Sequence, residues 1–413
     1  MKNNNYNYKI KLKKINVEKY FDFNNEKKDY YNNYQNKGII EYIKNVFREN
    51  ILDINITNDI LNITLTNNEL IESINNEIRE YYNSKEMHIT RMFGSYILLQ
   101  KINGELKAVE ATPIPIKYCP LMIKLLKEVG GDYAEALIKS LESEDKEVQI
   151  KNMCKLIDEV VIKGGYFDTN RPLNSCEANV LFGASETMSS AFKNNLIDAA
   201  VIVSNNLGTI ITTNESNTQG AVKRMTGLFY TTPNKTIMDT AFESNIIPVY
   251  PYTAEINQLE GVKLAIKKGY KRIAVSVAAN DNYLHKELKK LETKDIKIYK
   301  FGLCSTGISK ETAEIMKENA DVVWSCASKY VKELIEPASI AQVGIKIPVH
   351  VMTKEGWTLI KNHLEELNKE LKKQDIKLTK GEDKPILLNT KENIKVLTKK
   401  EIKKCNDCPH PCI

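Results

Sequence analysis

The second half of the chain carries the pattern that most constrains the fold. Apolar, β-branched runs alternate there with amphipathic stretches of helical length, which is typical of a parallel sheet covered by helices on both faces. The sequence therefore predicts an α/β fold with a mostly parallel sheet. The expected strands are Arg272–Ala278, Ile296–Leu303, Asp321–Ser325 and Ile347–Met352, and the expected helices cover about 256–268, 282–292, 309–319, 327–335 and 355–374.

The first half shows different sequence patterns. Alternating segments on either side of Asn103-Gly104 predict a β-hairpin, because this dipeptide favours a tight turn. Amphipathic stretches at Ile39–Phe47 and Leu70–Tyr82 predict helices in an opening rich in Asn and Lys. We expect four regions: 1–86, a partly helical extension; 87–175, a smaller α+β region with the hairpin; 176–370, the α/β domain; and 371–413, a Lys-rich linker with a cysteine-rich tail.

Composition limits the class of protein. Hydrophobic residues make up 42% and charged residues 27%, which is typical of soluble globular domains. No stretch approaches the roughly 20 apolar residues of a membrane helix, and no secretory signal is seen, so we expect a cytoplasmic protein without membrane contact. The net charge of +6 comes from 59 basic and 53 acidic residues without a clustered basic stripe, and nucleic acid binding is not expected.

Three of the eight cysteines lie at the C-terminus with the spacing C-x2-C-x3-C: Cys405, Cys408 and Cys412. In a reducing compartment such thiols suggest metal or redox chemistry more than disulfides. Their spacing allows them to converge on an iron–sulfur cluster or another soft metal. Two alternatives remain open, a structural zinc site completed by His410 or a partner, and a solvated tail without a ligand.

Further cysteines lie in predicted loops. Cys304 and Cys326 each follow a predicted strand, so they are expected on the rim at the carboxyl ends of the sheet, where ligands bind in such folds. Cys119 begins a helix and Cys176 lies in a loop, and the four thiols could form one four-ligand metal site. Either rim cysteine alone would also fit as a small buried side chain, whereas Cys154, in mid-helix, is expected in the core.

Small and hydroxyl-bearing residues accompany the two rim cysteines. Ser305, Thr306, Gly307 and Ser328 stand at the starts of predicted helices, whose backbone N–H groups can bind an anion. This arrangement favours a second hypothesis, an enzyme that acts on a small anionic cofactor precursor with Cys304 or Cys326 as the catalytic nucleophile. A third reading is a structural subunit whose N-terminal helices dock a partner.

Between His88 and about Leu364 the chain resembles the methanogenesis marker protein 8 family of methanogenic archaea. The resemblance implies an association with methanogenesis, most plausibly with methyl-coenzyme M reductase: its assembly, its nickel cofactor or its reductive activation. A protein partner in that machinery is therefore expected. The resemblance rests on 118–121 (YCPL), 182–186 (FGASE), 206–214, 219–220, 253–256 (TAEI), 269–275, 305–309 (STGIS) and 326–331 (CASKYV).

The leading hypothesis is a methanogenesis accessory protein that binds an iron–sulfur cluster, with zinc as the alternative metal. Its body ligands would be Cys119, Cys176, Cys304 and Cys326, and the three tail cysteines would form a second or completing set. Whether the protein is an enzyme stays open at this point.

Overall fold

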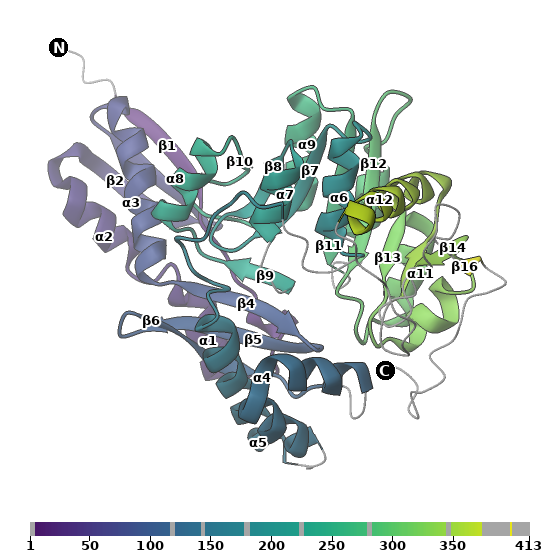
Figure 1. Ribbon diagram of the computed structural model, residues 1–413. Coiled ribbons are helices and arrows are strands. Elements are labelled where there is room, and N and C mark those ends of the chain that lie inside the picture. The colour runs from purple at the N-terminus through teal and green to yellow at the C-terminus, as the bar shows by residue number, and fades with distance from the viewer. Residues whose placement is uncertain are drawn as a thin grey trace.

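A nine-stranded sheet forms the larger part of the molecule (Figure 1). The computed structural model describes residues 5–115, 120–141, 145–176, 182–222, 227–278, 283–343, 348–373 and 397–398. In spatial order the strands are β10 (Ile247–Pro248), β8 (Gly208–Thr212), β7 (Ala199–Ser204), β11 (Arg272–Ala278), β12 (Lys297–Leu303), β13 (Val322–Trp324), β15 (Val349–Val351), β14 (Ala341–Val343) and β16 (Leu397–Thr398).

The centre of this sheet is parallel, as the sequence predicted. Strands β7, β11, β12 and β13 are parallel neighbours. The antiparallel pairings outside them leave six of the nine strands running in one direction, namely β10, β7, β11, β12, β13 and β14. The carboxyl ends of the four central strands therefore share one rim.

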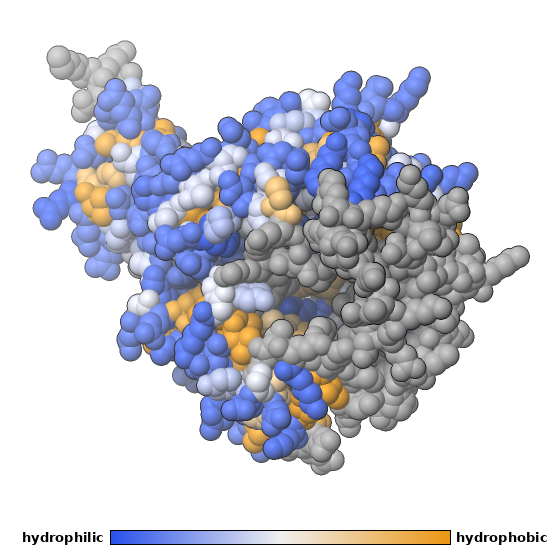
Figure 2. Space-filling model, viewed as in Figure 1, coloured by the Kyte–Doolittle hydropathy of each residue, from blue (hydrophilic) through white to orange (hydrophobic). Residues whose placement is uncertain are grey.

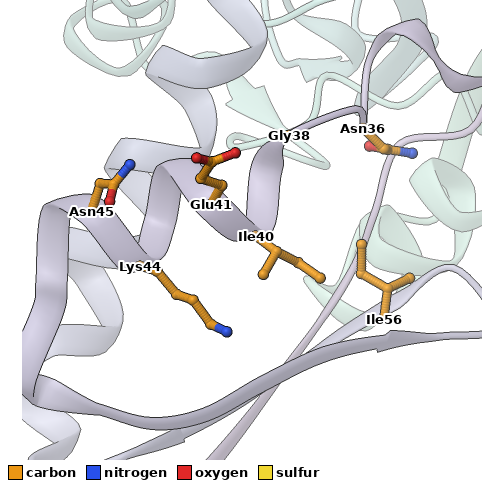
Figure 3. A pocket seen from close by; sticks show the side chains of 7 residues that line it. All are labelled: Asn36, Gly38, Ile40, Glu41, Lys44, Asn45 and Ile56. Carbon is orange, nitrogen blue, oxygen red and sulfur yellow. The ribbon is translucent and has the colours of Figure 1, made fainter.

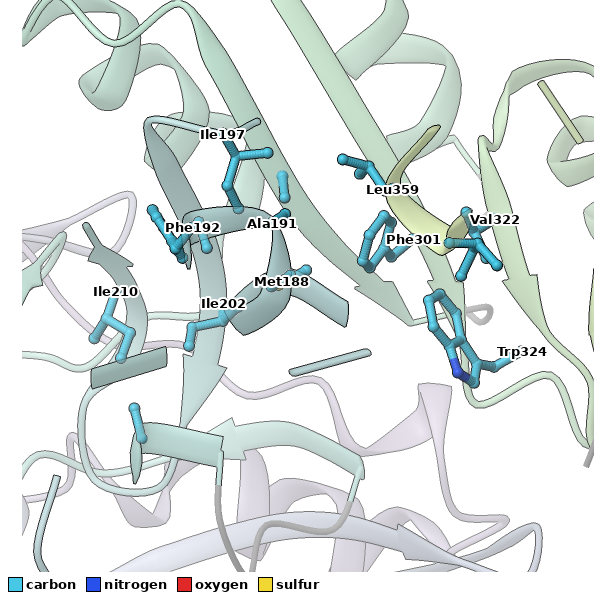
Figure 4. Packing of buried hydrophobic residues seen from close by; sticks show 14 of the residues in the cluster. Met188, Ala191, Phe192, Ile197, Ile202, Ile210, Phe301, Val322, Trp324 and Leu359 are labelled. Carbon is cyan, nitrogen blue, oxygen red and sulfur yellow. The ribbon is translucent and has the colours of Figure 1, made fainter. Parts of the chain in front are cut away.

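Helices cover both faces of the sheet. On one face Phe301, Val322 and Trp324 of the strands pack against α6, α7, α8 and α12 in one apolar cluster (Figure 4). On the other face, α9 and α10 pack on β7, β11 and β12, and α11 packs on β13. The helices are α6 (Ala184–Lys193), α7 (Glu215–Val222), α8 (Lys235–Glu243), α9 (Gln258–Lys267), α10 (Leu284–Lys289), α11 (Lys310–Asn319) and α12 (Lys354–Lys373).

A four-stranded antiparallel sheet adjoins the large one. It contains the predicted hairpin, whose turn residues Asn103 and Gly104 both have positive φ. Its edge strand β9 comes from the second half of the chain and returns to pair with β4. Its strands are β6 (Glu105–Ala111), β5 (Ser95–Ile102), β4 (Met87–Met92) and β9 (Gly227–Thr231), and its covering helices are α4 (Pro120–Leu141), α5 (Lys146–Leu156) and the π-helical η4 (Ile157–Ile162).

The N-terminal region contains more sheet than the sequence suggested. A three-stranded antiparallel sheet, in the order β1-β3-β2, packs against α2 and α3. Its strands alternate Ile, Leu or Tyr with Asn and Thr, a period-two pattern that is masked by the Asn-rich composition. The elements are β1 (Tyr6–Lys11), η1 (Val17–Lys19), α1 (Asn25–Tyr34), α2 (Ile39–Phe47), η2 (Arg48–Asn50), β2 (Ile51–Thr57), β3 (Ile60–Leu65), η3 (Asn68–Leu70) and α3 (Ile71–Ser84).

Two further differences concern the second half. The helix expected at 327–335 is a short π-helical segment, η5 (Val331–Ile335), and strand β14 was not predicted. Among the helices that the structure describes, none combines the length and the apolar composition that crossing a membrane requires.

Candidate functional site

The carboxyl ends of β12 and β13 bring Cys304 and Cys326 into adjacent loops. The two strands are parallel neighbours, with Gly302 paired to Val323. The hydroxyl of Ser305 donates to the Trp324 carbonyl over 2.8 Å and accepts from the Cys326 N–H over 2.9 Å. The N–H of Gly307 donates to the Ala327 carbonyl over 2.9 Å. These hydrogen bonds hold the two cysteine-bearing loops side by side.

The four-stranded sheet packs on this rim, next to the carboxyl ends of the strands. Arg91 of β4 donates to the carbonyl of Cys304 over 2.8 Å and to that of Thr306 over 2.6 Å. Its guanidinium also lies 4.9 Å from the centre of the Tyr96 ring. Gly227 of β9 is close enough that an added Cβ would lie 2.9 Å from the sulfur of Cys304. The rim site is therefore assembled from both sheets.

The backbone of Cys304 adopts a conformation that is uncommon for a residue with a side chain. Its φ of 55° lies in the left-handed region, which costs an L-residue roughly 1–2 kcal/mol. The two hydrogen bonds from Arg91 fall on either side of Ser305 and stabilise this turn. Strain of this kind persists only where the surroundings hold it in place, and it is often found at functional sites.

The two rim thiols differ in their environment. Burial, with a smaller contribution from the nearby Cys326, raises the pKa of Cys304 to about 11, and the positive charge of Arg91 opposes the shift only in part. Cys304 is thus a neutral thiol near pH 7, and a metal that binds it would have to displace its proton. Cys326 is exposed.

Among the other predicted metal ligands, Cys176 is the one that the structure describes, and it is not gathered at this rim. Cys176 is exposed beside α7, where the neighbouring Ser175 N–H donates to the Ser216 carbonyl. The opposite end of α7 reaches the carboxyl end of β7, because the Ala221 carbonyl accepts from Ser204. No group of three His, Cys, Asp or Glu residues suited to a metal occurs among the described residues. Four predicted ligands lie outside those residues: Cys119, Cys405, Cys408 and Cys412.

Cys154 lies where the sequence expected it, partly buried against the apolar cluster of α4, α5 and the hairpin. Burial, together with the charges of Glu110 and Asp158, raises the pKa of its thiol to about 12. It therefore serves as a matched control for the rim cysteines.

The groups expected to bind an anion already form hydrogen bonds within the protein. The Ser305 hydroxyl and the Gly307 N–H join the two rim loops, as described above. Ser328 is buried, and its hydroxyl accepts from the Val331 N–H at the start of η5 over 3.4 Å. An anion would have to compete with these bonds, so their evident role is to shape the rim.

Sequence reasoning did not find the covering residues Arg91, Tyr96 and Gly227. It also missed a buried polar cluster at the junction of the two sheets. There Glu86 accepts from the Asn206 side chain over 3.1 Å and lies 3.1 Å from Nε2 of His88. Burial opposes ionisation of Glu86, but the hydrogen bonds and charge of His88, with help from Asn206 and Lys101, lower its pKa. The cluster joins β4 to the turn after β7.

A pocket of about 460 Å³ lies between α2 and β2, outside the rim (Figure 3). Ile40 and Ile56 form its apolar part, and Glu41 and Lys44 lie at its margin. Figure 2 shows an apolar patch over α2 and β2, the elements that carry the exposed Val46, Leu52 and Ile56. None of the residues that line this pocket is a cysteine or histidine, so it does not compete with the rim as a metal site.

Comparison with known proteins shows which family the chain belongs to. Residues 88–365 match a family described as an uncharacterized protein conserved in archaea, DUF2099. An uncharacterized protein of Methanocaldococcus jannaschii is 36% identical over 267 residues, which cover 64% of this chain and 87% of that protein. The matched region includes the rim cysteines, the four-stranded sheet from His88 onward and the large sheet except β16, whereas the three-stranded N-terminal sheet precedes it.

Proposed function

We propose that this chain, which belongs to the DUF2099 family of archaeal proteins, is an accessory protein that binds a thiolate-ligated metal at the rim of its large sheet. The observation that carries the proposal is the adjacency of Cys304 and Cys326 at the carboxyl ends of neighbouring parallel strands. An iron–sulfur cluster is the first candidate and zinc the second, since thiolates are good ligands for both.

Two thiolates do not complete such a site, because zinc and iron–sulfur clusters usually have four ligands. Cys119 is the first candidate for a further one. It lies four residues after Pro115, whose ring and the Thr306 methyl would lie 2.7 and 2.9 Å from a Cβ added to Gly94. Pro115 thus lies against the Thr306 loop, and Cys119 follows it closely in the sequence. Cys405, Cys408 and Cys412 would form a second or completing set.

The biological part of the proposal is a role in methanogenesis. It is supported by the family's archaeal distribution, by the relative in Methanocaldococcus jannaschii, and by the resemblance to methanogenesis marker protein 8. Two of the segments that carry this resemblance, 305–309 and 326–331, form the rim loops. We assign the protein to the assembly or reductive activation of methyl-coenzyme M reductase in the cytoplasm, where a low-potential metal centre would deliver electrons.

Anaerobic purification of the full chain tests this function. Iron, zinc and acid-labile sulfide would be measured, together with the visible absorption spectrum before and after reduction. We expect iron and sulfide in equal amounts, with charge-transfer bands that bleach on reduction. Zinc without colour would support the alternative metal. A colourless protein free of iron and zinc, even after reconstitution with iron and sulfide, would contradict the proposal.

A further inference from the structure

We infer that Cys326 and Cys304 form a reversible dithiol–disulfide pair that reacts by exchange with small-molecule disulfides. The inference concerns two residues of the proposed metal site, but it requires no bound metal. It gives the rim a second chemistry, because a disulfide between these residues would prevent them from binding metal until they were reduced.

The geometry of the two loops carries the first step of the argument. A disulfide requires two Cα atoms about 4.4–6.8 Å apart, and neighbouring strands lie about 5 Å apart. Cys304 and Cys326 follow two such neighbours. The Ser305 hydroxyl links the loops through Trp324 and Cys326, and the Gly307 N–H links them through Ala327. These hydrogen bonds hold the two loops side by side, and the usual spacing of neighbouring strands falls within the range that a disulfide needs.

The different exposure of the two thiols carries the second step. Cys326 is exposed and can meet a disulfide from solvent, whereas Cys304 is partly buried with its sulfur against Gly227. Arg91 holds the turn of Cys304 by its carbonyl and by that of Thr306. An accessible cysteine beside a second, resolving cysteine is typical of redox-active pairs. Cys326 is thus assigned as the attacking residue and Cys304 as the resolving one.

The exchange proceeds in two balanced steps. The Cys326 thiolate attacks one sulfur of the external disulfide, forms a mixed disulfide and releases one small thiolate. The thiol of Cys304 then loses its proton to that thiolate and attacks the sulfur of Cys326, which releases the second small molecule as a thiolate. This thiolate takes up the proton that Cys326 gave to solvent when it ionised. The protein loses two protons and two electrons, and the external disulfide is reduced to two thiols.

The test uses the reduced full chain, freed of metal with a chelator and treated anaerobically with oxidised glutathione. Peptide mapping should show a Cys304–Cys326 disulfide and no lasting glutathione adduct on either residue. Cys304→Ser should trap a mixed disulfide on Cys326. Cys326→Ser should lower the rate of reaction at Cys304 by about tenfold or more, because that thiol is shielded.

Cys176, which is also exposed, is the matched control, and Cys176→Ser should leave the Cys304–Cys326 linkage unchanged. Lasting glutathione on Cys326 in the wild-type chain would overturn the inference, as would linkage of Cys326 to Cys119 or to a tail cysteine. Metal analysis of the reduced protein is a separate measurement. The disulfide can therefore form while metal binding fails, or the reverse, and the two proposals are tested independently.

Discussion

The two ends of β13, with the parts of β12 beside them, show opposite ways of placing polar groups. At the amino end of β13, beside the middle of β12, Lys300 and Asp321 are both 2% exposed and form an ion pair of 2.9 Å. Lys300 also donates to Glu292 over 3.2 Å and to the Ile298 carbonyl over 2.6 Å. Asp321 further accepts from the Lys300 N–H and from the Thr353 hydroxyl. This cluster satisfies its charges internally and joins the two strands to α12.

At the carboxyl end, Cys326 is exposed, and the nearby Arg91 binds backbone carbonyls. This comparison distinguishes two roles, which could not be told apart from the residue types alone. Buried charges that compensate one another support the fold, whereas thiols held on a shaped and accessible rim can meet a metal or a disulfide.

The largest effect is expected from breaking the amino-end cluster. Asp321→Asn removes the charge that compensates the buried Lys300 and should lower the free energy of unfolding by about 3–5 kcal/mol. Urea denaturation measures this loss. The matched control is Asp239→Asn, which breaks an exposed pair with Lys235 and should cost about 0.5 kcal/mol or less. Equal losses in the two variants would show that the buried cluster contributes no more to the free energy of unfolding than an exposed ion pair does.

A second buried lysine sharpens the comparison, because it has no carboxylate at hydrogen-bonding distance among the described contacts. Lys13 donates to the Ala254 carbonyl over 3.0 Å and lies 4.5 Å from the centre of the Tyr230 ring. Burial lowers its pKa to about 7, although the charge of Glu255 opposes the shift. The unfolded chain therefore binds more protons than the folded one above pH 7, and stability should rise with pH up to the unfolded pKa near 10.5.

Lys13→Met tests this linkage by removing the titrating group. Between pH 7 and pH 9 the wild-type chain should gain about 2–3 kcal/mol of stability relative to the variant. Tyr230 and Tyr82 face the same region and have pKa values raised by burial, so both stay neutral over this range. Parallel pH profiles for the two chains would show that Lys13 is solvated in the folded state.

A smaller effect is expected at the cover of the carboxyl end. Gly227→Ala would place a methyl group 2.9 Å from the Cys304 sulfur, and such overpacking costs about 1–3 kcal/mol. The variant should also change how quickly Cys304 is alkylated in the metal-free protein. The control is Ser95→Ala, a change at a buried position that tests general disturbance of the four-stranded sheet. Gly269→Ala would not serve as a control, because Gly269 has positive φ. If Gly227→Ala changed neither the alkylation rate of Cys304 nor the free energy of unfolding, the sulfur of Cys304 would not lie against Gly227.

The smallest effect on folding is expected from the tail. Strand β16 ends at Thr398, so deletion of Lys404–Ile413 leaves every described element intact. The free energy of unfolding should change by about 0.5 kcal/mol or less. The metal content should fall if the three tail cysteines bind metal. A large loss of stability would instead make the tail a structural element, and an unchanged metal content would exclude it from the ligand set.

The sequence predicted those elements whose pattern is strong and local. The strand Arg272–Ala278 and the helix Ile39–Phe47 were found with their observed bounds, the first from an apolar run and the second from helical periodicity. The alternation of strands and helices also predicted that Cys304 and Cys326 share one rim, whereas the adjacency of their strands is a finding of the structure.

The cover of the rim could not be predicted in the same way. Arg91 contacts Cys304 across 213 residues of chain, and only the docking of the two sheets brings them together. Gly227 is similar, because its strand returns from the second half to the small sheet. The burial of Lys300 was hidden as well, since its partner Asp321 directly precedes the next strand. Each of these contacts depends on tertiary packing, which leaves little local signal in the sequence.

The most direct test of the account is the metal content of anaerobically purified Cys304→Ser/Cys326→Ser protein, compared with the wild-type chain and with Cys154→Ser. The account predicts that Cys154→Ser retains the wild-type amount of metal per chain, because Cys154 packs among apolar side chains of α4, α5 and the hairpin. The double variant should lose the rim metal while keeping its fold by circular dichroism. Equal metal in the double variant and the wild-type chain would contradict the assignment of the rim as the metal site.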